Sequence, residues 1–482
     1  MREPVKLRLF VEHTRIERNN LLMKKHNLII WITVGCISLV ATFIGMICAE
    51  TTEQFLISLL PLIYILSITL SGTFQKLIDS SSPGFMIINF LYFIKCVVYP
   101  VISVISGTTY DSGNNDTIYA ICMEIGEVVV IYVVFFIYTK YNSNQQPVCS
   151  KYSLIQNHME KGHIVTLFFL LLVLGICIVY PRALSSYNFF TVKSLTIIYE
   201  GISESDSNGI IALIIKISRY VLTAYLLGFY YRKYEQTRKV VYIFYAVIIV
   251  GLTMMIVRGV SRSDFVIPGI CGYFLLIRMF PKYKKTISIL LLGCLVIVFL
   301  TFTSMRYGPM ESLSHISETL QAYFCCEKNM VKAIEARRIY GNEIGINTLV
   351  SDLFGNWTKV GGLFRKYYNI SDYFNFTYHG HTYAVDQIVP TIGQAYMQFG
   401  VLGTYTYTVF MVILALKFDS KYRKSDKIDF SYLYLYGAVK CATTLMGNLK
   451  IFSATVFNVL FPMWLLFYLN QKMAIAKKRG AL

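Results

Sequence analysis

The sequence predicts an all-α integral membrane protein with about twelve transmembrane helices. Of its 482 residues, 55% are hydrophobic and only 15% are charged, whereas soluble globular proteins carry about 25% charged residues. The apolar residues gather into stretches of about 20, the length that a helix needs to cross a bilayer. A chain this apolar is also unlike a disordered protein. These observations exclude a soluble globular protein and favour a multi-pass helical bundle.

Twelve apolar stretches follow one another, and we expect each to form a transmembrane helix. They cover residues 28–48, 55–72, 85–106, 118–139, 163–181, 209–231, 240–257, 263–280, 286–304, 389–416, 430–446 and 451–470. The first is not a cleavable signal peptide, because it follows a long basic tail and no small-residue cleavage site comes after it. The expected parts are a basic N-terminal tail (1–27), nine helices (28–304), a long loop (305–388), three helices (389–470) and a basic C-terminal tail (471–482).

The basic residues predict that both termini are cytoplasmic. In that orientation the cytoplasmic segments hold 27 Lys and Arg residues and the external segments hold 13, eight of them in the long loop. Cytoplasmic loops carry an excess of Lys and Arg in membrane proteins, and long loops contribute little to this rule. Most of the net charge of +18 is therefore an orientation signal, and nucleic acid is not an expected partner.

The loop 305–388 lies between the ninth and tenth predicted helices and is external in this topology. A loop of about 84 residues is usually functional. Apolar residues at helical spacing predict a helix over residues 311–324. This helix either packs on the bundle, which we favour, or lies on the membrane surface.

Three arginines stand on the external side, against the orientation rule. Arg258 and Arg262 lie in the short turn before the eighth helix, and Arg306 ends the ninth helix. Arginine binds phosphate with a bidentate fork that lysine does not reproduce. We therefore expect these residues to bind a lipid-linked diphosphate, with ordinary lipid phosphate or an ion pair to Asp264 as the alternative.

Ionisable residues inside the predicted spans are costly in hydrocarbon and are candidates for function. They include Lys95, Glu124, Glu127, Lys216, Arg219 and Lys440. Glu124 and Glu127 share a helix face because they are three residues apart, and so do Lys216 and Arg219. The two pairs could neutralise each other as a buried network, or they could shape a substrate cavity or a proton path.

His379, His381 and Asp386 stand where the long loop returns to the membrane. Histidine titrates near neutral pH and is the most common general base, so one of the two histidines is a candidate base; ordinary surface histidines are the alternative. The chain has no P-loop, no HExxH motif and no CxxC pair, and we expect no metal and no cofactor.

The chain resembles the bacterial O-antigen and capsular polysaccharide repeat-unit polymerases of the Wzy type. The resemblance rests on twelve spans, one long external loop before the last three spans, and four short segments. These segments are Arg258–Asp264, Met305–Gly308, His379–Asp386 and Gln394–Gly403, the last with a Phe-Gly-x-x-Gly sequence. The resemblance implies a GT-C-like polymerase or ligase bundle in the bacterial cytoplasmic (inner) membrane.

The resemblance also implies a metal-independent glycosyltransferase that polymerises repeat units linked to undecaprenyl diphosphate. Its expected partners are this lipid-linked oligosaccharide, the lipid bilayer, and flippase and chain-length regulator proteins. In this interpretation Arg258, Arg262 and Arg306 bind the diphosphate, and His381 or His379 is the base, oriented by Asp386. Lys216, Arg219, Glu124 and Glu127 shape the cavity.

Two alternatives remain open. A lipid-linked oligosaccharide flippase also has about twelve spans and needs cations for the diphosphate, but such transporters usually lack a long external loop. An O-antigen-ligase-like transferase shares the loop and the donor and differs in its acceptor, which the sequence does not reveal.

Overall fold

The protein is a multi-pass helical membrane protein in the computed structural model. The structure describes residues 28–72, 74, 78, 82–113, 115–141, 163–184, 187–188, 209–258, 263–307, 312–357, 361–364, 367–381 and 388–478. Within these residues, seven helical segments are long and apolar enough to cross a membrane. They are Leu28–Cys48, Thr52–Ser71, Pro83–Ile105, Asp116–Tyr141, Ile210–Thr237, Val401–Lys424 and Leu449–Ala476. The predicted all-α membrane fold is confirmed at this level.

Several of the seven segments are built from more than one helix. Thr52–Ser71 contains α2 (Thr52–Ile57) and α3 (Leu60–Ser71), and Pro83–Ile105 contains α5 (Pro83–Phe93), the π-helix η1 (Ile94–Val98) and α6 (Tyr99–Ile105). The last segment contains α21 (Leu449–Thr455), the π-helix η7 (Val456–Leu460) and α22 (Phe461–Lys478). The unbroken helices among them include α7 (Asp116–Tyr141) and α10 (Gly209–Thr237).

The remaining predicted apolar stretches are also helical. The shorter ones are α8 (Ile164–Val179), α11 (Val241–Met255) and α20 (Ile428–Thr444). A bend of 114° separates α12 (Ser263–Met279) from α13 (Lys284–Tyr307), and the short 3-10 helix η4 (Pro281–Tyr283) lies at the bend. By length and composition, seven helical segments within the described residues could cross a membrane, or eight if the bent pair forms one span.

The tenth predicted stretch, 389–416, is divided in the structure. Its first part is the separate helix α18 (Thr391–Phe399), which is followed by the 3-10 helix η6 (Val401–Gly403) and by α19 (Thr406–Lys424). Gly400 makes the break possible, because its φ of +69° is a conformation that other residues adopt at a cost. Hydropathy does not register such a break, since both sides of it are apolar.

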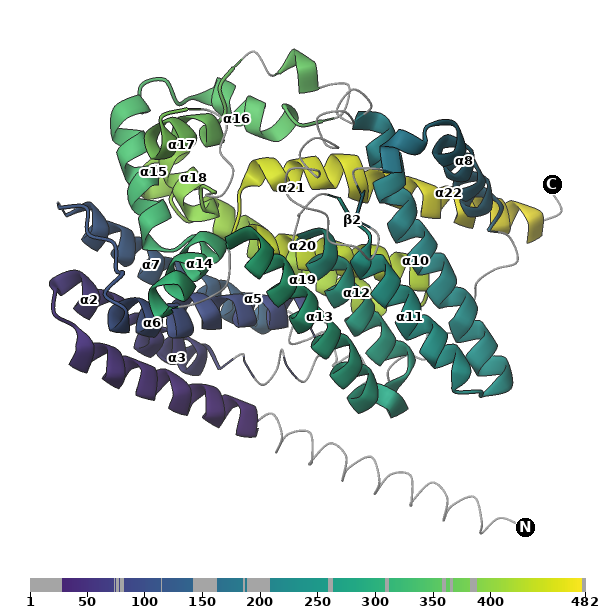
Figure 1. Ribbon diagram of the computed structural model, residues 1–482, viewed down its shortest axis with the longest axis horizontal. Helices are drawn as coiled ribbons and strands as arrows, with labels where there is room; N and C mark the ends of the chain where they lie inside the picture. Colours follow the sequence, from purple (N-terminus) through teal and green to yellow (C-terminus); the bar gives the residue numbers. More distant parts are fainter. Residues whose placement is uncertain are drawn as a thin grey trace, which may run out of the picture.

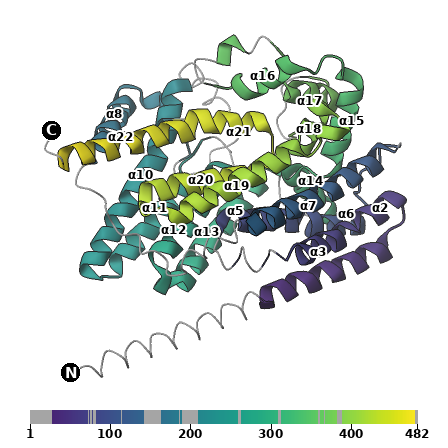
Figure 2. The same cartoon turned by 180° about the vertical axis from the view of Figure 1, so that it is seen from behind.

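The long loop forms a compact set of helices that packs on the bundle. It contains α14 (Leu313–Phe324), α15 (Glu327–Tyr340), α16 (Ile346–Phe354), η5 (Gly361–Leu363) and α17 (Ile370–His379). Figures 1 and 2 show these helices, in green, gathered with α18 at one end of the molecule. The first of them, α14, packs on α6, and Thr108 donates a hydrogen bond to Ser317 across this contact (2.7 Å). The predicted helix therefore packs on the bundle.

Helix α20 lies in the core and contacts α5, α10, α12 and α19. Its neighbour α19 contributes a buried carboxylate, Asp419, to the N-terminus of α5. Asp419 accepts hydrogen bonds from the Ser82 hydroxyl (2.5 Å) and from the backbone amides of Gly84 (2.8 Å) and Phe85 (3.2 Å). The first amides of a helix lack partners within the helix, so Asp419 caps α5 from a helix distant in the sequence.

Candidate functional site

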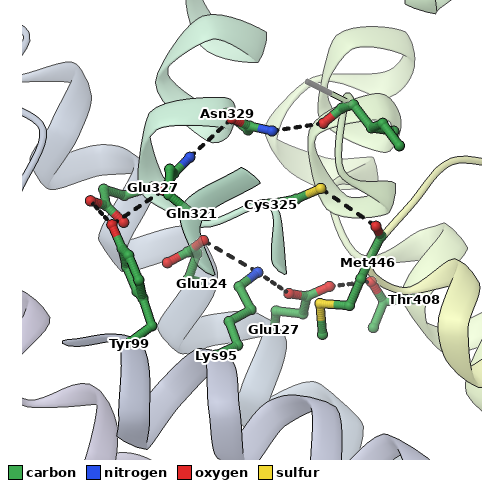
Figure 3. Close-up of polar contacts among 11 residues, drawn as sticks. Lys95, Tyr99, Glu124, Glu127, Gln321, Cys325, Glu327, Asn329, Thr408 and Met446 are labelled. Carbon is green, nitrogen blue, oxygen red and sulfur yellow. Dashed lines mark hydrogen bonds and ion pairs between the residues drawn. The ribbon is translucent and has the colours of Figure 1, made fainter. Parts of the chain in front are cut away.

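A buried charged cluster joins η1 to α7 and α19. Lys95 is 2% exposed, and its Nζ lies 3.2 Å from Oε1 of Glu124 and 3.4 Å from Oε2 of Glu127. Thr408 on α19 donates a hydrogen bond to the other oxygen of Glu127 (3.0 Å). Figure 3 shows the lysine between the two carboxylates. We name Lys95, Glu124, Glu127 and Thr408 the Lys95 cluster.

The local structure explains how Lys95 reaches both carboxylates. Residues Ile94–Val98 form a π-helix, and such insertions are frequent at functional sites because they redirect side chains. On α7, Glu124 and Glu127 are separated by three residues and point the same way. Glu124 is eight residues into α7, which places it about 12 Å along the helix axis from its beginning.

A chain of polar side chains from the long loop lies over the Lys95 cluster. The Tyr99 hydroxyl lies 2.5 Å from Oε1 of Glu327 and 3.2 Å from Oε1 of Gln321. Gln321 donates from Nε2 to Oδ1 of Asn329 (2.9 Å), and Asn329 donates from Nδ2 to the carbonyl of Ile388 (2.9 Å). Figure 3 shows this chain above Lys95. We name Tyr99, Gln321, Glu327 and Asn329 the Tyr99 chain.

The junction between α14 and α15 is inserted into the bundle rather than exposed on its surface. Cys325 ends α14 with a φ of +50°, and its thiol donates to the carbonyl of Met446 (3.4 Å). Cys326, Glu327 and Asn329 each have no exposed surface. The long loop is thereby anchored to the helical bundle at this junction.

A second ion pair, in which the lysine is partly exposed, joins α10 to α12. Lys216 Nζ lies 2.8 Å from Oδ1 of Asp264, and Lys440 on α20 is an electrostatic neighbour of both. Arg219 donates to the carbonyl of Ile256 and to the Tyr220 hydroxyl. Glu124 and Glu127 therefore do not neutralise Lys216 and Arg219: the carboxylates pair with Lys95, and Lys216 pairs with Asp264.

The three arginines predicted to bind diphosphate are only partly described. Arg258 lies in the two-residue strand β2 (Val257–Arg258), which pairs antiparallel with β1 (Tyr187–Asn188). This pairing brings the segment after α8 to the turn before α12. Arg306 lies in the last turn of α13, and the side chains of Arg258 and Arg306 are outside the described part of the structure, as is the whole of Arg262.

The two predicted histidines lie side by side at the end of α17. His379 is the last residue of the helix, and Gly380 caps it with a φ of +75°. The rings of His379 and His381 are nearly parallel, with centroids 5.7 Å apart. The ring centroid of Tyr378 lies 4.5 Å from the ring centroid of His379. Asp386, predicted to orient a histidine, is outside the described residues.

Tyr378 contacts His379, and a lysine joins Tyr378 to a second tyrosine, Tyr110. Hydropathy and motifs in the sequence did not indicate these residues. Lys328 Nζ lies 5.6 Å from the ring centroid of Tyr110 and 5.6 Å from that of Tyr378. Lys332, one turn later on α15, is another cation near both rings. Burial raises the pKa of the Tyr378 hydroxyl to about 12, so it stays protonated and can donate. The region combines cations, aromatic rings and imidazoles, groups that suit an anionic glycan.

The structure divides the predicted residues between two groups of helices. The histidines lie at the end of α17 and just after it, and α17 packs against α15, α16 and α18. Glu124 and Glu127 lie on α7, which packs against α15. Lys216, Arg219 and Arg258 lie on or next to α10 and α12. The helices in the described part of the structure hold no group of three or more His, Cys, Asp or Glu side chains that could bind a metal ion.

Comparisons of the chain with family models, with curated proteins and with solved structures gave no match. A functional assignment therefore depends on the residues and their arrangement.

Proposed function

We propose that the protein is a membrane glycosyltransferase that polymerises oligosaccharide repeat units carried on undecaprenyl diphosphate. The supporting observation is the arrangement of the long loop: it folds into helices that dock on the bundle and bring Tyr378, which Lys328 contacts together with Tyr110, against His379 and its neighbour His381. In the proposed topology these helices form a cap outside the membrane. Such a cap suits chemistry at the membrane surface better than the alternating access of a flippase, in which the outer side must open and close.

The proposal includes a topology of twelve spans in a GT-C-like bundle, with both termini in the cytoplasm of a bacterium and the long loop outside the cytoplasmic membrane. The five helical stretches that fall outside the set of seven candidate spans, α8, α11, α12, α13 and α20, would complete the twelve. Insertion of reporter enzymes after each helix would test this topology.

In the proposed reaction, a hydroxyl of one lipid-linked repeat unit attacks the anomeric carbon of the growing glycan. The bond from that carbon to the lipid diphosphate breaks, and the diphosphate leaves with the bonding electron pair. His381 or His379 takes the hydroxyl proton, with Asp386 as its orienting group. Arg258, Arg262 and Arg306 stabilise the negative charge of the leaving diphosphate. Lys216, Arg219, Glu124 and Glu127 hold the helices around the substrate.

Deletion of the gene tests the proposal through the surface polysaccharide that remains. A polymerase predicts loss of long chains while single repeat units are still exported, and restored long chains on complementation. Complete loss of export would instead indicate a flippase. Long chains that remain on the lipid carrier would indicate a ligase, and either of these outcomes would reject the polymerase.

A further inference from the structure

We propose that the Lys95 cluster and the Tyr99 chain together form a proton-binding site, in which Glu327 is a neutral acid while the α14–α15 junction is docked in the bundle. Loss of its proton releases the junction. This inference concerns the loop and is independent of the proposed enzymatic activity.

The hydrogen bonds of the Tyr99 chain have a defined direction. The carbonyl of Ile388 only accepts, so Asn329 must present its Nδ2 to it and its Oδ1 to Gln321. Gln321 must then present Nε2 to Asn329 and Oε1 to Tyr99. The orientation of both amides is thus set from one end of the chain, without reference to Glu327.

One proton is missing if Glu327 is ionised. The Tyr99 hydroxyl lies near two acceptor oxygens, Oε1 of Gln321 and Oε1 of Glu327, but it has one proton to donate. If Glu327 is protonated, its hydroxyl donates to Tyr99, and Tyr99 donates to Gln321. Every polar contact in the chain then has a proton, and the direction runs without conflict from Glu327 to Ile388.

The burial of Glu327 favours the same protonation state. The side chain has no exposed surface, and its Oε2 has no hydrogen-bond partner among the described residues. An ionised carboxylate in that position would keep one oxygen without a donor, which costs far more than an unpaired neutral oxygen. Burial raises the pKa of Glu327, an effect that the Tyr99 hydrogen bond, the backbone amides and Lys95 only partly oppose.

The charges around Glu327 also favour a bound proton. Lys95 is the one cation in the two named groups, and its neighbours Glu124 and Glu127 already provide two negative charges. A third carboxylate would leave two uncompensated negative charges in a buried site. The other titratable groups that face this site are Tyr92, Tyr99, Cys96, Cys325 and Cys326. None of them supplies a second positive charge.

Release of the proton would weaken the contact between loop and bundle. An ionised Glu327 would need water, and we expect separation of the α14–α15 junction from η1, α6 and α7 to supply it. Cys325 and Cys326 lie in this junction, and they are 1% and 0% exposed while it is docked. Burial raises the pKa of the Cys325 thiol to about 12, so a docked junction protects this thiol from reagents.

Maleimide labelling of the full-length protein in lipid vesicles tests the proposal, with modified cysteines identified by mass spectrometry. Cys48 is exposed and serves as the internal reference for the general increase in thiol reactivity with pH. Between about pH 6 and about pH 9, labelling of Cys325 and Cys326 relative to Cys48 is expected to rise about tenfold in the wild type. Unchanged relative labelling over this range would overturn the proposal.

The Glu327→Gln variant is the matched comparison, because its amide can donate to Tyr99 as the neutral acid does and cannot ionise. Its relative labelling is expected to stay low at all pH values. A rise equal to that of the wild type would show that another group controls the junction.

Infrared spectra give a second readout that does not require a pH change: the carbonyl band of a protonated acid should be present in the wild type at neutral pH and lost in Glu327→Gln. Identical spectra would also reject the neutral acid.

Discussion

The carboxylate of Asp419 accepts a hydrogen bond from the backbone amide of Gly84 at 2.8 Å, although the two residues are 335 positions apart in the chain. The same carboxylate binds the Ser82 hydroxyl and the Phe85 amide, so it holds the beginning of α5 against α19. The N-terminus of a helix carries partial positive charge, and a carboxylate there is stabilising. Since α5 leads into η1 and Lys95, this cap also positions the Lys95 cluster.

Replacement of Asp419 by Ala should destabilise the protein by about 2–3 kcal/mol, because the buried amides of Gly84 and Phe85 lose their acceptor. The measurement is thermal unfolding in detergent, followed by circular dichroism. Asp426→Ala, which removes an exposed carboxylate from the same end of α19 and α20, should change the midpoint little. Equal effects of the two substitutions would contradict the assigned role of Asp419.

Replacement of Gly84 by Ala should also destabilise this contact. A Cβ atom at this position would lie 3.0 Å from Oδ2 and 3.2 Å from Oδ1 of Asp419, so the carboxylate would have to move away from the amides. The loss should be smaller in an Asp419→Ala background, where the obstructing oxygens are absent. A double-mutant cycle measures this coupling, and additive effects would argue against it.

Removal of the Lys95 charge should destabilise the bundle more than the loss of buried apolar surface alone would. Lys95→Met leaves Glu124 and Glu127 buried without a cation, and breaking a buried ion pair typically costs about 3–5 kcal/mol. The triple variant Lys95→Met/Glu124→Gln/Glu127→Gln, which removes all three charges, should recover much of that stability. Lys282→Met, at an exposed position, is the control. A triple variant no more stable than Lys95→Met would contradict this account.

Asp352 should make the stability of the long-loop helices depend on pH. Burial raises its pKa from 3.8 to about 7, against the opposing effect of the Gln394 amide, which donates to it at 2.9 Å. The folded state therefore holds the proton more tightly than the unfolded state. The bound proton of Asp352 therefore adds to the free energy of unfolding. This contribution, at most about 4 kcal/mol, is fully present below about pH 4 and is lost as the pH rises to about 7.

The Asp352→Asn variant tests this effect, because it cannot ionise. Between about pH 4 and about pH 7 its unfolding midpoint should fall less steeply than that of the wild type. Protection of the α16 amides from hydrogen exchange should show the same difference. A wild type whose stability rises over this range relative to the variant would reverse the assigned direction.

The proposed chemistry predicts that His381→Ala and Arg262→Ala abolish or strongly reduce polymerisation, since a positioned base typically contributes about 100-fold or more to the rate. Complementation of the gene deletion, followed by electrophoresis of the surface polysaccharide, measures the effect. His315→Ala alters another histidine of the long loop, and full-length glycans should remain. Undiminished polymerisation by His381→Ala and Arg262→Ala proteins that insert normally would reject these assignments.

Lys328→Met should weaken use of an anionic substrate if the region beside the histidines binds it. The lysine lies over two tyrosine rings, so Lys328→Arg should keep both the charge and the ring contacts, and should retain more activity than Lys328→Met. Dependence of chain synthesis on repeat-unit concentration measures the effect. Equal activity of all three proteins would show that the region does not contact the substrate.

Hydropathy was sufficient to locate the helical stretches of the bundle that the structure describes. Each of them is a long apolar run, whether its surface faces lipid or other helices. Hydropathy did not locate the break at Gly400, since apolar residues occupy both sides. The three-residue spacing of Glu124 and Glu127 indicated that they share a helix face, which follows from helix geometry alone. The sequence did not identify their partner, because several cations were available and Lys95 is selected only by the way η1 lies against α7.

The sequence by itself determined that this is a helical membrane protein, that its long loop is large enough to fold, and which few ionisable residues lie within apolar helices. These properties depend on composition and on spacing along one helix. Only the tertiary structure decided that Lys216 pairs with Asp264, that the strand at Arg258 pairs with Tyr187, and that Tyr99 meets Glu327. Such contacts join residues far apart in the chain, and they depend on how whole helices pack against one another.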